Sequence, residues 1–264
     1  MDSHAPGELL LWQLGFVPLQ CGSLLLSRAK PTSIGKVEIS STALTVHGTF
    51  YSTVGLRLNQ WCRNMTGITP RIRSILLGGM LGDGGLSMSH SSVNPYYVFT
   101  QTTKLFWYCW ALFLELSHLC QKSPTLGSST RYGITSYFMQ IHTRSYPFLM
   151  DWYNAFYPLI KGVRTKIVPV FGLHHLDPLA LAIWAMDDGA FAKPGFYFHT
   201  KGFTFLEVYK LARILHYNFV LECTVQNHSG MPVIYIVANS IPLFVSIVKP
   251  HFYSGFLYKL GLDQ

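Results

Sequence analysis

Two aspartates stand at equivalent places in two similar stretches of the chain. Asp83 ends the apolar run in "ILLGGMLGDGG", Asp188 ends the one in "LAIWAMDDGA", and glycine follows each directly. At the end of a helix, such a carboxylate would lie beside backbone carbonyls that have no intrahelical partner, so side-chain and backbone oxygens converge. Oxygen ligands of this kind are what Mg²⁺ requires. The two stretches therefore predict a site for divalent cations.

Both aspartates are predicted to stand at the C-terminal ends of helices. The two stretches begin with Thr69 and Asp177, residue types that cap helix N-termini, and each is followed by proline, which is favoured at the first helical position. About three turns of apolar sequence then lead to the acid. A negative charge at a helix C-terminus costs about 0.3 to 1 kcal/mol. Stability therefore does not account for the repeated acid, whereas cation binding does.

Small residues occur along both predicted helices. They would let two helix backbones approach closely, and such packing would bring Asp83 and Asp188 together. Two neighbouring carboxylates repel each other unless a cation neutralises them, so the pairing itself favours bound metal. Gly82 and Asp187, the residues just before the acids, would add backbone oxygens. The small residues are Gly78, Gly79 and Gly82 in the first helix and Ala180, Ala182 and Ala185 in the second.

The sequence around each acid follows the same plan. We call the two predicted helices that end at Asp83 and Asp188 the acid-tipped helices. After each of them we expect two strands, a helix, two more strands and a last helix, which makes an αββαββα unit that occurs twice. The first unit spans residues 68–160, with its last two strands within 131–145, and the second spans 177–264. A basic linker at 161–176 joins them, and residues 1–67 are an N-terminal extension without an assigned role. The predicted fold class is α+β, a pseudo-twofold pair with one antiparallel sheet in each half.

Polar and basic side chains gather on the strands and turns that follow the two acids. Alternation along a strand would place about half of them on one face of a sheet. A twisted sheet can lie in the major groove of DNA, where Gln, Lys, His and Thr side chains read base edges. The candidate DNA-binding residues are Ser87, Ser89, His90, Thr100, Gln101, Thr102, Lys193, His199, Thr200 and Lys201.

The overall charge favours an anionic partner. The chain has 20 Lys and Arg against 12 Asp and Glu, a net charge of +8, which suits nucleic acid or an acidic membrane surface. The most apolar segment, residues 104–120, is short for a membrane span and carries Glu115 and His118. It is predicted to be an amphipathic helix packed in the core. Five cysteines without a CxxC pair indicate neither a disulfide framework nor a zinc site.

The two motifs resemble those of the LAGLIDADG homing endonucleases in their single-chain, two-motif form. The stretches "LLGGMLGDG" and "LAIWAMDDG" look like its two motif copies. The second copy, together with "MPVIYIVANSIPLFVSIVKPHFYSGFLYKLG", is similar to the monomeric omega-intron branch of that family. The resemblance covers residues 68–262. The stretch "GDGG" departs from the family's usual "DADG" but keeps the acid.

The resemblance implies a monomeric enzyme that cuts both strands of a long, non-palindromic DNA site, with one acid serving each strand. Asp83 and Asp188 would be metal ligands, and Mg²⁺ or Mn²⁺ would activate a water and stabilise the leaving oxygen. Lys166 in "KIVP" and Lys259 in "LYKLG" match the family's basic active-site pair and would hold the attacking water or the scissile phosphate. An intron-encoded protein of an organelle is also implied, in the mitochondrion or alternatively the chloroplast.

Two other functions stay open on the sequence alone. An RNA maturase on the same scaffold would use the basic surface to hold an intron and would not need to cleave. The retained Asp83 and Asp188 favour cleavage, and a dual role is compatible with both. A small integral membrane protein is the third hypothesis, and it rests on hydropathy alone.

Overall fold

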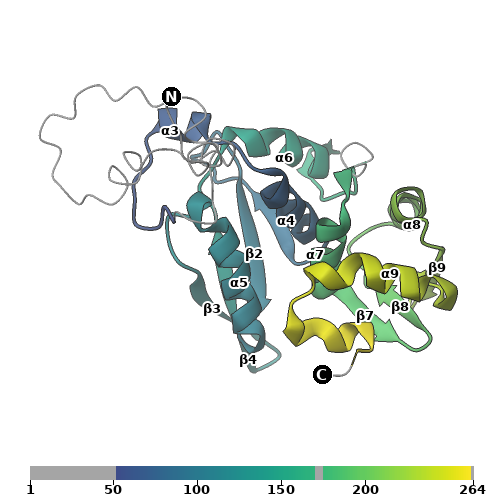
Figure 1. The fold of residues 1–264 in the computed structure, drawn as a ribbon. Coiled ribbons are helices and arrows are strands. Elements are labelled where there is room, and N and C mark those ends of the chain that lie inside the picture. The colour runs from purple at the N-terminus through teal and green to yellow at the C-terminus, as the bar shows by residue number, and fades with distance from the viewer. Residues whose placement is uncertain (1–51, 170–174, 263–264) are drawn as a thin grey trace, which may run out of the picture.

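The computed structural model describes residues 52–169 and 175–262 of the chain. These residues fold into two halves, each built on a four-stranded antiparallel sheet. The halves lie side by side in Figure 1, the first in blue to teal and the second in green to yellow. The predicted α+β class and the repeated αββαββα plan are confirmed.

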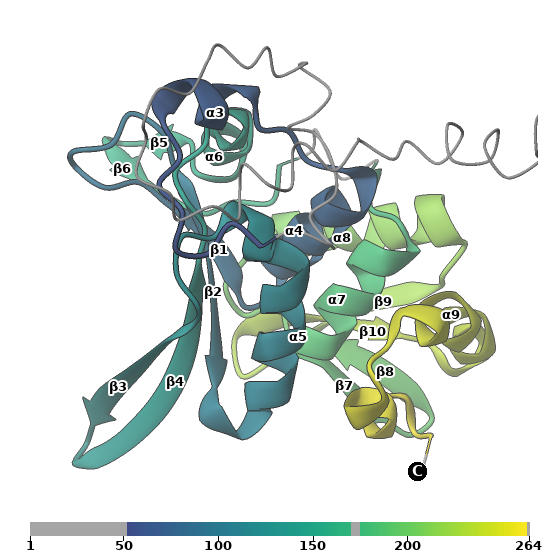
Figure 2. The same ribbon diagram turned by 60° about the vertical axis from the view of Figure 1, so that its left-hand side comes forward.

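The first half packs its helices on one face of its sheet. Its elements are α3 (Gln60–Met65), α4 (Pro70–Leu81), β1 (Gly84–Ser87), β2 (Tyr96–Thr102), α5 (Phe106–Leu116), β3 (Thr125–Arg131), β4 (Ile134–His142) and α6 (Met150–Phe156). The strand order is β1-β2-β4-β3. In Figure 2, α4 and α5 lie on the same side of β2 and β4, and no helix of the described residues lies on the other side.

The second half repeats this arrangement with the strand order β7-β8-β10-β9. Its elements are α7 (Pro178–Asp188), β7 (Gly189–Ala192), β8 (Gly195–Phe198), α8 (Phe205–Phe219), β9 (Cys223–His228), β10 (Met231–Ile236), α9 (Ile241–Val248) and the 3₁₀ helix η8 (Ser254–Leu260). A hairpin of β5 (Leu159–Ile160) and β6 (Val163–Arg164) opens the connection, across the boundary expected at residue 160. Short 3₁₀ turns are η2 (Thr103–Leu105), η3 (Ser117–Leu119), η4 (Pro147–Leu149), η6 (Ala238–Ser240) and η7 (Lys249–His251).

The two acid-tipped helices begin where their capping residues predict. Thr69 Oγ1 accepts a hydrogen bond from the Ile72 amide at 3.3 Å, and Asp177 Oδ1 accepts one from the Ala180 amide at 2.8 Å. Each cap satisfies an amide that has no partner inside the helix. The prolines occupy the first helical positions, as expected.

Helices α4 and α7 lie against each other between the two halves (Figure 2). A Cβ added to Gly78 would stand 2.7 Å from the Cβ of Ile183 and would also meet the carbonyl oxygen of Ala180. A Cβ on Gly82 would stand 2.5 Å from the Cβ of Asp187. Real Cβ atoms do not approach that closely, so glycine at both positions is what allows the helices to touch. The predicted close packing of the pair is therefore found.

Two details differ from the sequence-based expectation. Gly79 was expected to help the helices approach, but a Cβ there would instead meet the hydroxyl group of Tyr97 on β2. The third strand, β3, begins at Thr125 and lies mostly before the expected 131–145 segment. Its burial pattern is largely exposed on both faces, so it lacks the apolar alternation that reveals a half-buried strand.

The aromatic segment at 104–120 forms α5 followed by the 3₁₀ turn η3. One side of α5 is buried in the core, with Tyr108, Cys109 and Leu112 at most 1% exposed. Phe106 and Leu114 on the other side are half exposed. The amphipathic packing expected from the sequence is confirmed. Among the described residues, no helix combines the length and apolar character needed to cross a bilayer.

We predict that Gly78→Ala destabilises the protein and that Gly78→Leu does so further, because each puts atoms where α7 already lies. Overpacking of this kind costs about 1 to 3 kcal/mol. The free energy of unfolding, measured by urea denaturation, reports the loss. Gly202→Leu is the matched control, since a Cβ at Gly202 meets nothing within 4 Å. Equal stability of the Gly78 and Gly202 variants would show that the helices do not meet at Gly78.

We also predict a loss of stability on acidification that depends on His118. Burial lowers the pKa of His118 to about 4 from the ordinary 6.5, and its Nδ1 is buried without a hydrogen-bond partner in the described chain. The unfolded chain therefore binds the proton first, so the contribution of neutral His118 is complete above pH 6.5 and is lost as the pH falls toward 4. The loss amounts to at most about 3 kcal/mol.

Urea unfolding at several pH values in that window measures this effect. The His118→Leu variant, which cannot titrate, should lose less stability than the wild type between pH 6.5 and 4. His216→Leu removes an exposed histidine of α8 and serves as the control. Parallel pH profiles for the wild type and His118→Leu would refute the assignment.

Candidate active site

The pairing of α4 and α7 brings the two predicted acids to one place. Asp83 lies just past the end of α4, where Gly82 is the C-cap, and Asp188 is the last residue of α7. The amide of Asp83 donates a hydrogen bond to Oδ2 of Asp187, 3.2 Å away. The two helix ends are thus joined directly, and Asp83 lies close enough to Asp188 for its charge to raise the pKa of Asp188.

Asp187 breaks the twofold symmetry of the site. Its carboxylate fills the space that Gly82, its counterpart on α4, leaves open. Oδ1 accepts a hydrogen bond of 2.6 Å from the hydroxyl group of Tyr108, which is fully buried on α5. Burial and the nearby charge of Asp83 raise the pKa of Asp187 well above its ordinary value, although the hydrogen bond from Tyr108 lowers it. Sequence reasoning considered only the backbone oxygen of Asp187 and missed this role of its side chain.

Gln101 of β2 holds Asp83 from the first sheet. Its Nε2 donates a hydrogen bond of 2.8 Å to Asp83 Oδ2. Partial desolvation raises the pKa of Asp83, and the hydrogen bond from Gln101 together with the charges of Lys259 and Lys166 opposes that rise. Gln101 was expected to read DNA, but it is buried at 6% exposure and faces the acid, because odd-numbered residues of β2 point inward. Gln101 therefore holds the carboxylate of Asp83 in place.

The charge around Asp188 suits a cation. Partial burial, followed by the negative charge of Asp83, raises the pKa of Asp188 to about 7. A carboxylate pair that resists ionisation for this reason gains when a metal ion supplies positive charge. The described residues contain no group of three or more His, Cys, Asp or Glu arranged to hold a metal. Any ion here would therefore draw on the two acids together with backbone oxygens, a donor set that fits Mg²⁺ or Mn²⁺.

Two lysines reach the acid pair. Lys166 Nζ donates a hydrogen bond of 3.0 Å to the carbonyl oxygen of Gly84, and Lys259 Nζ on η8 donates one of 3.1 Å to the carbonyl oxygen of Asp187. Burial lowers the pKa of both ammonium groups, and the charges of the nearby aspartates offset this. The structure thus brings Lys166 and Lys259 to the acids. The backbone oxygen of Asp187 was expected to face a metal, and here it accepts the hydrogen bond from Lys259.

The ten candidate DNA-binding residues do not all face outward. Thr200 is 2% exposed, and its hydroxyl group donates to the carbonyl oxygen of Pro232 at 2.9 Å, so like Gln101 it is not available to base edges. Thr100 is half-buried and faces out of β2, where Gln140 Nε2 donates to its hydroxyl group at 3.1 Å. The remaining seven are exposed: Ser87, Ser89, His90, Thr102, Lys193, His199 and Lys201.

Further polar side chains share the outward faces and were missed. On β4, Gln140 and His142 alternate with the buried Met139 and Ile141, and Gln140 is paired in register with Thr100. In the second sheet the hydroxyl group of Tyr197 donates to Gln226 Oε1 at 2.9 Å. The same period-two test that was applied to the strands after the acids would have found the β4 positions.

The sequence matches a known family over most of the described chain. A sequence model described as the LAGLIDADG DNA endonuclease family covers residues 73–244. The chain is also 28% identical over 209 residues to the cytochrome b mRNA maturase bI2 of Saccharomyces cerevisiae, which is 75% of this chain and 49% of the relative. It is 39% identical over 90 residues to the intron-encoded endonuclease ai4 of Dictyostelium discoideum, 33% of this chain and 57% of that protein. The chain thus spans about half the length of these relatives.

A solved structure shares the fold. The homing endonuclease I-WcaI bound to its DNA recognition sequence superposes with a TM-score of 0.66 at 22% sequence identity. The likeness covers 74% of this chain and 88% of that one. At this level of identity, the match establishes the α+β architecture with its two four-stranded sheets.

We predict that Tyr108→Phe lowers the free energy of unfolding by about 1 kcal/mol or more, because it leaves Oδ1 of Asp187 without its donor. Thermal unfolding of the metal-free protein measures the effect. Tyr137→Phe is the control, since that side chain is 56% exposed. If the two variants melt at the same temperature, the bond between Tyr108 and Asp187 contributes nothing to stability.

Proposed function

The chain belongs to the LAGLIDADG DNA endonuclease family, and on this basis we propose that it makes metal-dependent double-strand breaks at a specific site in DNA. The observation that carries the proposal is the pairing of Asp83 and Asp188 at the joined ends of α4 and α7. Two lysines beside two acids form a centre with two similar halves, one for each strand of a duplex. A purely structural helix pair would have no use for these charges.

The side chains at the centre divide the chemistry between them. Asp83 and Asp188 would hold Mg²⁺ or Mn²⁺, which when bound would activate a water and stabilise the leaving 3′ oxygen. Lys166 and Lys259 would place positive charge beside the scissile phosphates and orient the attacking water. Gln101 fixes the carboxylate of Asp83 by its 2.8 Å hydrogen bond. Tyr108 fixes Asp187 between the two helices.

The outward faces of the two sheets would bind the target. Each sheet carries exposed polar side chains beyond the acid on its own half, so a duplex lying across both sheets would pass over the centre. The two faces differ in sequence, because Thr100 and Gln140 line the first while Tyr197 and Gln226 line the second. Unlike half-sites would therefore be read, and the target would be long and non-palindromic. A single chain supplies both halves, 68–160 and 177–264, which supports a monomer.

The relatives support an intron-encoded origin. The Dictyostelium discoideum protein is named an intron-encoded endonuclease, and the Saccharomyces cerevisiae protein is named a cytochrome b mRNA maturase. We extend the intron-encoded origin to this chain and propose the mitochondrion as its location. The chloroplast is the alternative.

We expect Asp83→Asn and Asp188→Asn each to keep the fold and DNA binding and to abolish double-strand cleavage, because each removes a metal ligand without changing volume. The rate should fall by about two orders of magnitude or more. A library of randomised duplexes with Mg²⁺, followed by sequencing of cut ends, first identifies the target of the wild type. Asp151→Asn, on the exposed side of α6, is the control. Double-strand cleavage at the wild-type rate by either Asp83→Asn or Asp188→Asn would rule out the two-acid mechanism.

A second candidate function, intron RNA maturation, is favoured by the match to a maturase over 75% of this chain. Splicing assistance would use the basic surface and not the acids. The double variant Asp83→Asn with Asp188→Asn should then still promote splicing of the precursor RNA that contains its own intron. If neither the wild type nor the double variant changes the splicing rate, the maturase function is rejected.

A further inference from the structure

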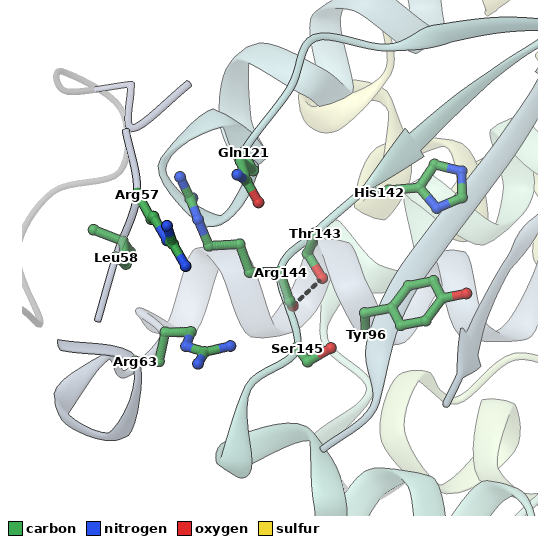
Figure 3. A pocket seen from close by; sticks show the side chains of 9 residues that line it. All are labelled: Arg57, Leu58, Arg63, Tyr96, Gln121, His142, Thr143, Arg144 and Ser145. Atoms are coloured by element: carbon green, nitrogen blue, oxygen red, sulfur yellow. Dashed lines mark hydrogen bonds between the residues drawn. The ribbon is translucent and has the colours of Figure 1, made fainter. Parts of the chain in front are cut away.

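A pocket of about 720 Å³ opens at one end of the first sheet, away from the acids. Three arginines line it, and we call it the arginine pocket: Arg57 and Arg63 come from the segment before the family match, and Arg144 follows β4. Figure 3 shows the side chains of Arg57 and Arg63 reaching toward the stretch that carries Thr143, Arg144 and Ser145. The proposed nuclease chemistry makes no use of these three side chains.

Arg144 fastens the N-terminal segment to the first half. It is only 8% exposed, and its two terminal nitrogens donate four hydrogen bonds of 2.6 to 2.8 Å, to Thr53 Oγ1 and to the carbonyl oxygens of Thr53, Leu56 and Cys120. All four acceptors are neutral. Arg144 therefore holds Thr53 and Leu56 in place, which sets Arg57 at the mouth of the pocket. Among the described residues, no carboxylate forms an ion pair with Arg144.

In the part of the chain that the structure describes, no carboxylate forms an ion pair with the other two arginines. Within residues 52–169 and 175–262 the ion pair found is Arg71 with Glu115, outside the pocket. The side chain of Arg57 is exposed and makes no hydrogen bond there, and Nε of Arg63 is buried without a hydrogen-bond partner. Three like charges at one pocket repel each other, and an anion relieves that repulsion. Guanidinium groups suit phosphate in particular, because their planar forks bind two of its oxygens.

The arginine pocket continues the outward face of the first sheet. Tyr96 begins β2 and His142 ends β4, and both occupy outward positions because Tyr97 and Ile141 beside them are buried. Their rings lie 5.9 Å apart and line the pocket. A duplex lying on Thr100 and the strands around it would therefore reach the pocket with its backbone at the end of the sheet.

We propose that the arginine pocket binds a phosphate of the target duplex, so that residues 52–66 extend the DNA-binding surface beyond the two repeated units. This inference rests on the proposed function in one respect, because it requires that duplex DNA binds to the first sheet. It assigns a role to Arg57 and Arg63, which belong to neither repeated unit. Arg144 acts as a positioning residue, since both of its terminal nitrogens already donate hydrogen bonds within the protein.

Salt dependence of binding tests this directly. The probe is random-sequence duplex DNA of about 30 base pairs without divalent cations, so that nothing is cut and phosphate contacts dominate. We measure the dissociation constant between about 50 and 200 mM salt for the wild type and for Arg57→Gln with Arg63→Gln. Arg213→Gln, an exposed arginine of α8 in the other half, is the matched control. Melting temperatures verify that the variants are folded.

The log–log slope of affinity against salt should become shallower by about 0.9 in the double variant, the value of one phosphate contact, and stay unchanged in Arg213→Gln. If the wild type binds the duplex and all three proteins show equal slopes, the arginine pocket does not bind a phosphate of the duplex, and the nuclease proposal is unaffected. A wild type that fails to bind duplex at all would overturn both. If the double variant loses affinity for a hairpin RNA and not for duplex DNA, the pocket serves RNA and the assignment to DNA is wrong.

Discussion

Helices α4 and α7 pass each other with glycine at the points of closest contact. At Gly78 a side chain would overlap Ile183, and at Gly82 it would overlap Asp187. This approach determines where the helices end relative to each other, and therefore where Asp83 and Asp188 stand. Each helix also fixes the strand that follows it, because β1 and β7 begin within one residue of the acid. The contact thus places both the charged centre and the start of both sheets.

The centre combines charges that would each be unfavourable alone. Burial raises the pKa of Asp83 and Asp188, and it lowers the pKa of Lys166 and Lys259. The lysines and the aspartates offset part of each other's shift, whereas the charge of Asp83 raises the pKa of Asp188 further. Desolvation remains the largest effect on every one of them. A site that tolerates this cost is better explained by function than by stability.

The two halves share a plan and differ in detail. Asp187 fills the space opposite Gly82. The end of α7 therefore carries a second carboxylate beside Asp188, whereas the equivalent position on α4 is the glycine. Tyr108 of the first half supplies its hydrogen bond, which means that the helices are joined through an asymmetric set of partners. The first half also holds residues 52–56 through Arg144. Such differences between the halves agree with the proposed recognition of two unlike DNA half-sites.

The sequence by itself determined the repeated helices, the two acids and the order of elements, because caps, prolines and apolar periodicity act over a few residues. It did not predict β3, whose exposed pattern carries no periodic signal, nor the inward direction of Gln101, which depends on strand register, nor the burial of Thr200 against Pro232. The bond between Tyr108 and Asp187, and the meeting of Arg57 with Arg144, join residues tens of positions apart. Only tertiary packing decided those contacts, since residues so far apart in the chain meet only when the helices and sheets pack together.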